Sequence, residues 1–165
     1  MASGDSLIQF HPYNNEPPTA NYATLDTRNQ RPCLDFDATT NESAVFSGVM
    51  PAHYGAGGVT VHIWWAASSD TTDTHHCYWD AAFEEVIEGG LDVDGDSFAA
   101  VNSVDTDHCN ATSGILTVTE ITFTDGADMD SVGAGDGFRL QITRDAANDD
   151  MTGDAEVYWV EINET

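Results

Sequence analysis

Histidine and cysteine residues cluster at two places in the chain. His75, His76 and Cys77 are consecutive, and His108 and Cys109 are adjacent. Each group begins a segment with strand periodicity, so the two groups are expected to be neighbours. Two histidines and two cysteines (His75, Cys77, His108 and Cys109) suit a tetrahedral structural zinc ion, whereas the two cysteines alone suit a disulfide. Because the spacing matches no tight Cys-x-x-Cys pattern, buried free thiols are the third alternative.

Three carboxylates alternate along one short loop. Asp92, Asp94 and Asp96 are spaced as at the start of a calcium-binding loop. The EF-hand pattern is not followed, because Gly95 comes two places early and Ser103 stands where a glutamate is needed. No helical periodicity flanks the loop, so a solvated acidic turn is favoured over a specific cation site.

The block Gly4-Asp5-Ser6-Leu7 spells the motif of a family of lipase-like hydrolases. That family requires an α/β fold and an Asp-x-x-His pair near the C-terminus. Here the last histidine is His108 and helix periodicity is almost absent. The match is interpreted as a coincidence, and no nucleophile elbow, phosphate loop or dinucleotide fingerprint occurs. We therefore expect no catalytic, cofactor-binding or metal-binding residues, no cofactor, and no enzyme activity.

Two features of the sequence concern carbohydrates, either as an attached glycan or as a bound ligand. Three Asn-x-Ser/Thr sequons, at Asn41, Asn110 and Asn163, permit glycosylation. Exposed tryptophan or tyrosine side chains could instead stack on a bound sugar. The tryptophans are Trp64, Trp65, Trp79 and Trp159. All of them lie in predicted strands, so core packing is the expected role for most of them.

The elements that position these groups are strands. Apolar residues alternate with polar ones, as in the segment 59–65, which predicts two-faced antiparallel strands. Strands are predicted at 6–10, 32–36, 44–49, 59–65, 77–83, 113–123, 138–142 and 155–162. The periodicity of 113–123 changes near Glu120, where a bulge is expected. The segment 155–162 is apolar on both faces, which predicts a strand covered on both sides. The fold class is therefore all-β, an antiparallel jelly-roll sandwich.

The first 32 residues differ from the rest. They are polar, carry prolines at positions 12, 17 and 18, and lack sustained periodicity. Residues 1–32 are predicted to form an extended N-terminal arm with a possible first strand, and residues 33–165 the jelly-roll domain. Cys33, inside an apolar strand, is expected to be a core residue.

The charge balance is extreme. The chain has 29 Asp and Glu against 4 Arg and no Lys, giving a net charge of −25 over 165 residues. Such self-repulsion destabilises a compact state, and salt relieves it by shortening the screening length to about 3 Å at 1 M. The composition predicts a protein of concentrated brine. It argues against nucleic-acid binding and against anionic membranes, and the segment 1–10 has neither the basic start nor the apolar stretch of a secretion signal.

Several segments carry a resemblance to a known group. They are VTEITFTD (118–125), MDSVGAGD (129–136), FRLQITRD (138–145), GDAEVYWVEI (153–162) and LDTRNQRPCLDF (25–36). These segments resemble strands of jelly-roll structural proteins of tailed viruses, most of all a capsid decoration (cement) protein of a haloarchaeal tailed virus. The resemblance implies a virion protein on the capsid exterior that forms a homotrimer and binds the major capsid protein. The alternative is a receptor- or glycan-binding jelly-roll module of a tail fibre or spike.

The charge balance yields a first prediction. Raising NaCl from about 0.1 M to about 1 M shortens the screening length from about 10 Å to about 3 Å, and should stabilise the folded state. A gain of about 3 kcal/mol would raise the thermal midpoint by about 10 °C in a chain of this size. Circular dichroism melts measure the shift, with an uncharged osmolyte of equal osmolality as the control. A midpoint indifferent to salt would contradict the interpretation of the charge.

Overall fold

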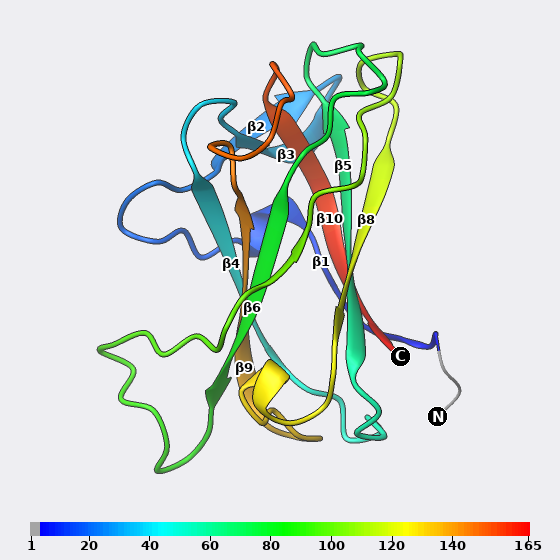
Figure 1. Cartoon of the computed structure of the whole chain (residues 1–165). Helices are drawn as coiled ribbons and strands as arrows, with labels where there is room; N and C mark the ends of the chain where they lie inside the picture. The colour runs from blue at the N-terminus through cyan, green and yellow to red at the C-terminus, as the bar shows by residue number, and fades with distance from the viewer. Residues whose placement is uncertain (1–3) are drawn as a thin grey trace.

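The structure, a computed structural model, describes residues 4–165, which form two antiparallel β-sheets packed face to face (Figure 1). Sheet A has the order β2 (Thr24–Arg28), β3 (Arg31–Phe36), β10 (Ala155–Glu164), β5 (Val59–Ala67) and β8 (Thr117–Phe123), and β1 (Ser6–Phe10) also pairs with β10. Sheet B has the order β4 (Glu42–Val49), β9 (Gly137–Arg144), β6 (Trp79–Val86) and β7 (Asn102–Val104). From β3 to β6 the chain crosses between the sheets at every connection, and it does so again from β7 to β10. This arrangement is a jelly-roll sandwich, as predicted.

The apolar side chains that alternate along the strands meet between the two sheets. Phe83 of sheet B packs edge-on against Phe123 of sheet A, with ring centroids 5.0 Å apart. Phe36 and Trp79 make a second such contact across the sandwich, also at 5.0 Å. Edge-to-face pairs of this kind add to the free energy gained by burial. The core therefore comes from the inward-facing half of each strand.

Two 3₁₀ helices, η1 (Pro12–Asn14) and η2 (Ala127–Met129), are the helical elements of the described region. Neither comes near the length of an apolar span, and no helix within residues 4–165 could cross a membrane.

The strands agree closely with the sequence patterns. The predicted segments 6–10, 32–36, 44–49, 59–65, 138–142 and 155–162 all fall within strands β1, β3, β4, β5, β9 and β10. Two predictions differ from the structure. The predicted strand 77–83 begins only at Trp79, in β6. β8 keeps continuous register with β5 from Thr117 to Phe123, so there is no bulge at Glu120. The irregular part lies before Thr117, where residues 113–116 form a loop rather than the start of the strand.

The region predicted as an arm lies on the sandwich. Its expected first strand is β1, which pairs with β10 at the middle of sheet A. The chain then passes along β4, where the amide of Glu16 donates to the carbonyl of Val45 at 2.8 Å and the amide of Ala23 donates to that of Ser43 at 3.0 Å. It enters sheet A again as β2. The domain boundary drawn between residues 32 and 33 falls inside β3.

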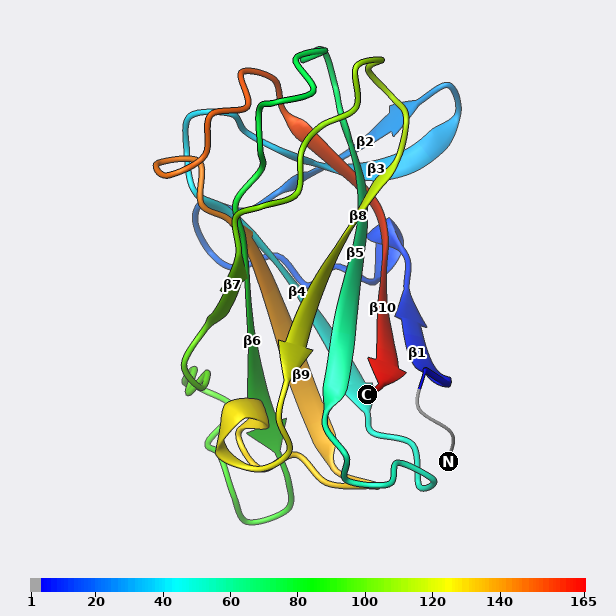
Figure 2. The same ribbon diagram turned by 45° about the vertical axis from the view of Figure 1, so that its right-hand side comes forward.

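The strand β10 changes partner halfway along its length. On one side it pairs with β3 through residues 155–157 and then with β1 through residues 160–163. On the other side it pairs with β5 throughout, with a register shift between Val157 and Trp159. Figure 2 shows β1 beside the lower part of β10 and the β2–β3 hairpin beside the upper part. The shift is a β-bulge, and it re-aims the side chains at this point.

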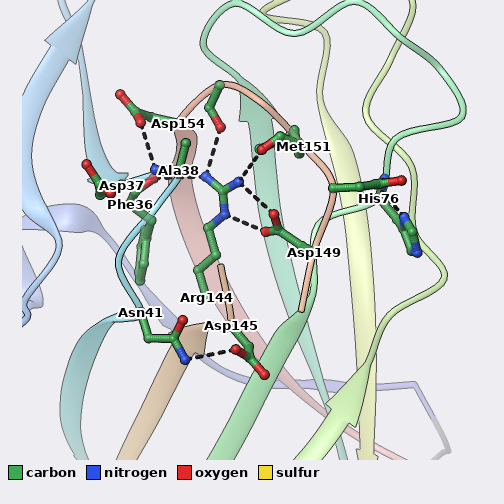
Figure 3. Close-up of polar contacts among 12 residues, drawn as sticks. Phe36, Asp37, Ala38, Asn41, His76, Arg144, Asp145, Asp149, Met151 and Asp154 are labelled. Carbon is green, nitrogen blue, oxygen red and sulfur yellow. Dashed lines mark hydrogen bonds and ion pairs between the residues drawn. The ribbon is translucent and has the colours of Figure 1, made fainter. Parts of the chain in front are cut away.

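A buried arginine holds the end of the sandwich where β10 begins (Figure 3). The Arg144 side chain is 0% exposed and that of its partner Asp149 is 1% exposed. The Nε and one terminal nitrogen of Arg144 donate to the two carboxylate oxygens of Asp149 at 2.7 and 3.2 Å. The remaining hydrogens reach the carbonyls of Phe36, Gly153 and Met151 at 3.1, 2.8 and 2.9 Å. Every N–H of the guanidinium thus has an acceptor.

The arginine yields a second prediction. Replacing Arg144 with Met should lower the free energy of unfolding by about 3–5 kcal/mol, because it leaves the Asp149 charge buried without a partner. Urea unfolding followed by tryptophan fluorescence measures the loss. The same substitution at the exposed Arg31 is the matched control, and it should change stability by no more than about 0.5 kcal/mol. Equal losses for the two variants would show that Arg144 has no special structural role.

Candidate functional site

The outer face of sheet A, opposite the core, carries a second group of apolar side chains. Cys33, Ala66 and Tyr158 form a buried cluster separate from the main core, and the partly exposed Trp159 packs against it. We call this cluster, together with Trp64, the outer aromatic face. No strand of sheet B can cover it, because sheet B packs on the opposite side. Large aromatic side chains in such a position are not explained by core packing.

Two tryptophans from neighbouring strands lie together on the outer aromatic face. Trp64 of β5 is registered with Trp159 of β10, and their ring centroids are 5.4 Å apart with planes inclined at 30°. Tyr158 meets Trp159 edge-on at 6.5 Å. Trp64 and Trp159 are partly open to solvent, whereas Tyr158 is buried. These rings form a rigid apolar surface, which we call the platform, on the neighbouring strands β5 and β10.

The bulge in β10 explains how two consecutive aromatics can share one face. In a regular strand, adjacent side chains point to opposite faces. Val157 and Val160 both point into the core, so the extra residue between them leaves both Tyr158 and Trp159 on the outer face. The bulge lies where β10 passes from β3 to β1. The local change of pairing therefore builds the platform.

Polar groups border the platform on the β3 side. Arg28 forms an ion pair with Glu156 at 2.7 Å, and Tyr158 donates its hydroxyl hydrogen to the same carboxylate oxygen at 3.1 Å. Arg28 also donates to the Ala67 carbonyl at 3.2 Å and to the Ser113 hydroxyl at 3.4 Å. Ordered donors and acceptors beside aromatic rings are typical of a ligand-binding surface.

The β2–β3 hairpin sets the position of the arginines. Its two loop residues, Asn29 and Gln30, have φ values of 50° and 64°, which is the left-handed conformation required at both positions of a type I′ turn. Asparagine accepts this conformation readily, whereas glutamine does so less well. The tight turn places Arg28 directly opposite Arg31. Like charges in such a cross-strand pair destabilise a sheet.

A pocket of about 270 Å³ opens between the hairpin, the 113–116 loop and the platform. Its lining residues are Arg28, Asn29, Arg31, Ser113, Gly114, Leu116, Tyr158 and Trp159. Gly114 has φ +80°, and a Cβ atom there would lie 3.0 Å from the Arg28 guanidinium carbon. Glycine at this position therefore lets the loop pass over the arginine.

The protonation states in the pocket are well defined. The hydrogen bond to Glu156 raises the pKa of Arg28, which stays charged. Burial and the charge of Glu156 raise the pKa of Tyr158 to about 12, so its hydroxyl is a neutral donor. Burial likewise raises the pKa of the Cys33 thiol to about 12, which makes it a poor nucleophile.

The structure brings the two histidine and cysteine groups together, as predicted. His76 and His108 form an isolated antiparallel bridge, and their rings stack 5.8 Å apart. Cys77 and Cys109 are buried free thiols, so of the three alternatives the described structure favours thiols over a disulfide. His75 pairs with Asp70 at 2.8 Å and His76 pairs with Asp150 at 2.6 Å. Within residues 4–165, no group of three or more His, Cys, Asp or Glu is arranged to hold a metal ion.

The acidic loop at 92–96 is a turn. The amide of Asp94 donates to the Asp92 side chain at 3.0 Å, and Asp96 pairs with Arg139 at 2.6 Å. Arg139 also pairs with the buried Glu84 at 2.8 Å. The carboxylates of Asp92 and Asp96 thus have protein partners, and these two partners differ.

The remaining sequence motifs fall in ordinary structural positions. Ser6 opposes Asn163 in the β1–β10 pair, and no hydrogen bond joins it to a histidine in the part of the chain that the structure describes. The Asn41 side chain donates to Asp145 at 2.8 Å and accepts from the Ala147 amide at 3.1 Å (Figure 3). Both polar atoms of its side-chain amide are therefore hydrogen-bonded within the protein.

Sequence reasoning missed the outer aromatic face. Trp65 and Trp79 are core residues, as predicted, but Trp64 and Trp159 lie on the outside. Cys33 is buried, but it belongs to the outer cluster and not to the core. The sequence did contain an indication of this face. The segment 155–162 is apolar on both faces, and this pattern was interpreted as a strand covered on both sides. No second layer lies over it, and its outer side is the platform.

Asp35 lies on the same outer face and yields a third prediction. Burial, together with the charges of Asp154 and Glu156, raises its pKa to about 6, above the ordinary value of about 4. Between these values the folded state binds more protons than the unfolded state, so stability falls as pH rises through this window and is level above it. Asp35→Asn should therefore stabilise the protein above pH 6, by about 1 kcal/mol once solvent screening is allowed for, and have no effect below pH 4.

Urea unfolding at a series of pH values measures this difference. Asp37→Asn is the control with the opposite sign, because hydrogen bonds from Thr39 and Thr40 lower the pKa of Asp37. Asp37→Asn should therefore reduce the free energy of unfolding at neutral pH. A stabilising effect of Asp35→Asn that did not change with pH would contradict the assigned titration.

Comparisons with known proteins bear on the fold. No protein-family model and no curated protein matches the chain. Among solved structures, the xylan-binding module CBM15 is 11% identical, with a TM-score of 0.58 and coverage of 98% of this chain and 98% of that chain. A family 35 carbohydrate-binding module from an environmental isolate is 10% identical, with a TM-score of 0.55 and coverage of 94% and 92%.

A third match is part of a larger protein. A family GH115 4-O-methyl-α-glucuronidase with specificity for decorated arabinogalactans is 8% identical, with a TM-score of 0.55. The match covers 99% of this chain but only 18% of that enzyme. At these identities the likeness establishes the all-β jelly-roll sandwich and leaves function to be argued from the site.

Proposed function

We propose that this chain is a glycan-binding module and that the outer aromatic face of sheet A is its binding surface. The observation that carries the proposal is the pair Trp64 and Trp159, whose ring centroids lie 5.4 Å apart on the side of the sheet away from the core. The C–H faces of a pyranose ring are apolar and flat, and they match an aromatic surface of this size. A tryptophan pair held by two strands offers that surface at little entropic cost.

The polar border supplies what a sugar needs besides stacking. Sugar hydroxyl groups both donate and accept hydrogen bonds, and they lose water on binding. Arg28, Glu156 and the Tyr158 hydroxyl present donors and acceptors in fixed positions. Fixed partners can replace the lost water bonds without a further ordering cost. The arrangement favours a polyhydroxylated ligand over a purely apolar one.

The structural neighbours agree with this proposal. Two of them that match this chain over nearly its whole length are carbohydrate-binding modules. A jelly roll hosts many functions, so the likeness adds support to the site and does not replace it. The proposal corresponds to the alternative function considered from the sequence, a glycan-binding jelly-roll module. The absence of enzyme activity stays a prediction, to be checked by incubation with the bound glycan.

Capsid decoration also stays a prediction, together with the major capsid protein as partner, the homotrimer and the location on a virion. Neither the described residues nor the structural neighbours bear on it. Purified particles would decide the matter, since decoration requires hundreds of copies in each particle and a tail module requires a handful.

The binding surface yields the fourth prediction. Trp159→Ala should weaken glycan binding at least about tenfold, equivalent to about 1.4 kcal/mol, because it removes half of the stacking surface. Isothermal titration against xylan, mannan and galactan oligosaccharides measures the loss, and quenching of tryptophan fluorescence in the wild type gives a second readout. Thermal melts establish that the variant is folded.

Tyr13→Ala is the matched control, because Tyr13 is 69% exposed and lies on η1, outside the proposed site. It should bind as the wild type does. Binding that survives Trp159→Ala and is lost in Tyr13→Ala would place the site on the N-terminal segment and refute the proposal.

A further inference from the structure

We infer that the pocket beside the outer aromatic face selects an acidic sugar, with Arg31 binding its carboxylate and Arg28 assisting. The inference deepens the proposed glycan-binding function and rests on it. It assigns the ligand class to uronic acids, in which a carboxylate replaces the primary alcohol of a neutral hexose.

The distribution of positive charge is the first observation. The whole chain has four arginines and no lysine against 29 acidic residues. Arg144 is buried on Asp149, Arg139 is paired with Glu84 and Asp96, and Arg28 is paired with Glu156. In the described part of the chain, Arg31 is the one arginine whose side chain makes no hydrogen bond or ion pair, and it is exposed. With so many carboxylates available, an unpaired guanidinium calls for an explanation.

The position of Arg31 is the second observation. It stands opposite Arg28 across the β2–β3 hairpin, in a like-charge pair that destabilises the sheet. The single carboxylate of Glu156 contacts Arg28 and leaves Arg31 without a partner. Two arginines therefore occupy one cross-strand pair and border one pocket, at a cost in stability. A ligand anion that lies between them would offset this cost.

The lining of the pocket is the third observation. Both arginines border it, together with Tyr158 and Trp159, and none of its lining residues is Asp or Glu. The nearest outward carboxylates of the hairpin are those of Asp26 and Asp35. Both residues lie further from the turn than the Arg28–Arg31 pair does. Positive charge, aromatic rings and hydroxyl partners thus meet in a space of about 270 Å³. This combination matches a sugar ring that bears an anion.

The geometry of the guanidinium points to a carboxylate. Arginine presents planar paired donors that fit the two oxygens of a carboxylate in parallel, and such charge-assisted bonds are roughly twice as strong as neutral ones. A sulfate ester also carries negative charge, and arginine binds tetrahedral oxyanions through paired donors too, so a sulfated sugar is the competing ligand in the test. The net charge of −25 repels any anion at long range, and molar salt removes that repulsion beyond about 3 Å while direct contacts persist.

The test uses sugars that differ at one carbon. Methyl glucuronide and methyl glucoside are titrated into the full chain in molar salt, followed by amide chemical shifts, and glucose 6-sulfate is titrated in parallel. The wild type should bind the glucuronide at least about tenfold more tightly than the glucoside. Arg31→Gln should abolish that preference, and Arg31→Lys should retain part of it.

Val93→Asp is the matched control, because Val93 is 80% exposed, lies outside the pocket lining and changes the net charge by the same unit. It should keep the preference. Equal binding of glucuronide and glucoside by the wild type would overturn the acidic-sugar inference and leave the proposed function standing. Absence of binding to every glycan would overturn both. A preference that survives in Arg31→Gln, or tighter binding of the sulfate than of the glucuronide, would overturn the assignment of Arg31 to a carboxylate.

Discussion

The buried ion pair between Arg144 and Asp149 organises one end of this sandwich. Its guanidinium lies at the end of β9 and binds the carbonyls of Phe36, Met151 and Gly153, so it connects the end of β3 with the loop that leads into β10. A charge in such a place is tolerated only when all of its donors are satisfied. Because the loop is held in this way, β10 starts at a defined position and in a defined register.

The register of β10 in turn decides what the outside of sheet A presents. This strand carries Glu156, Tyr158 and Trp159, and its bulge lies where it exchanges β3 for β1. Without the extra residue, one of the two aromatics would enter the core. The platform, its polar border and the pocket are therefore consequences of strand pairing, and strand pairing depends on contacts between residues far apart in the chain.

Acidic residues far outnumber basic ones in this molecule. That this excess adapts the protein to concentrated salt stays a prediction. The few arginines are consequently informative, because three of them are committed to carboxylates that are buried or nearby. The exception, Arg31, faces the aromatic pocket. In a protein of ordinary charge the same residue would pass unnoticed among many surface cations.

The sequence by itself determined the fold class, most of the strands and the acidic surface. Alternation with period two needs only local information, and segments such as 59–65 and 138–142 were therefore predicted correctly. Alternation separates the two faces of a strand, but it does not say what covers each face. For this reason core packing was expected for most of the four tryptophans, although Trp64 and Trp159 lie on the outer face. Only the tertiary structure paired Arg28 with Glu156 across 128 positions and brought Arg31 to the pocket, since such contacts arise from sheet pairing that local sequence does not encode.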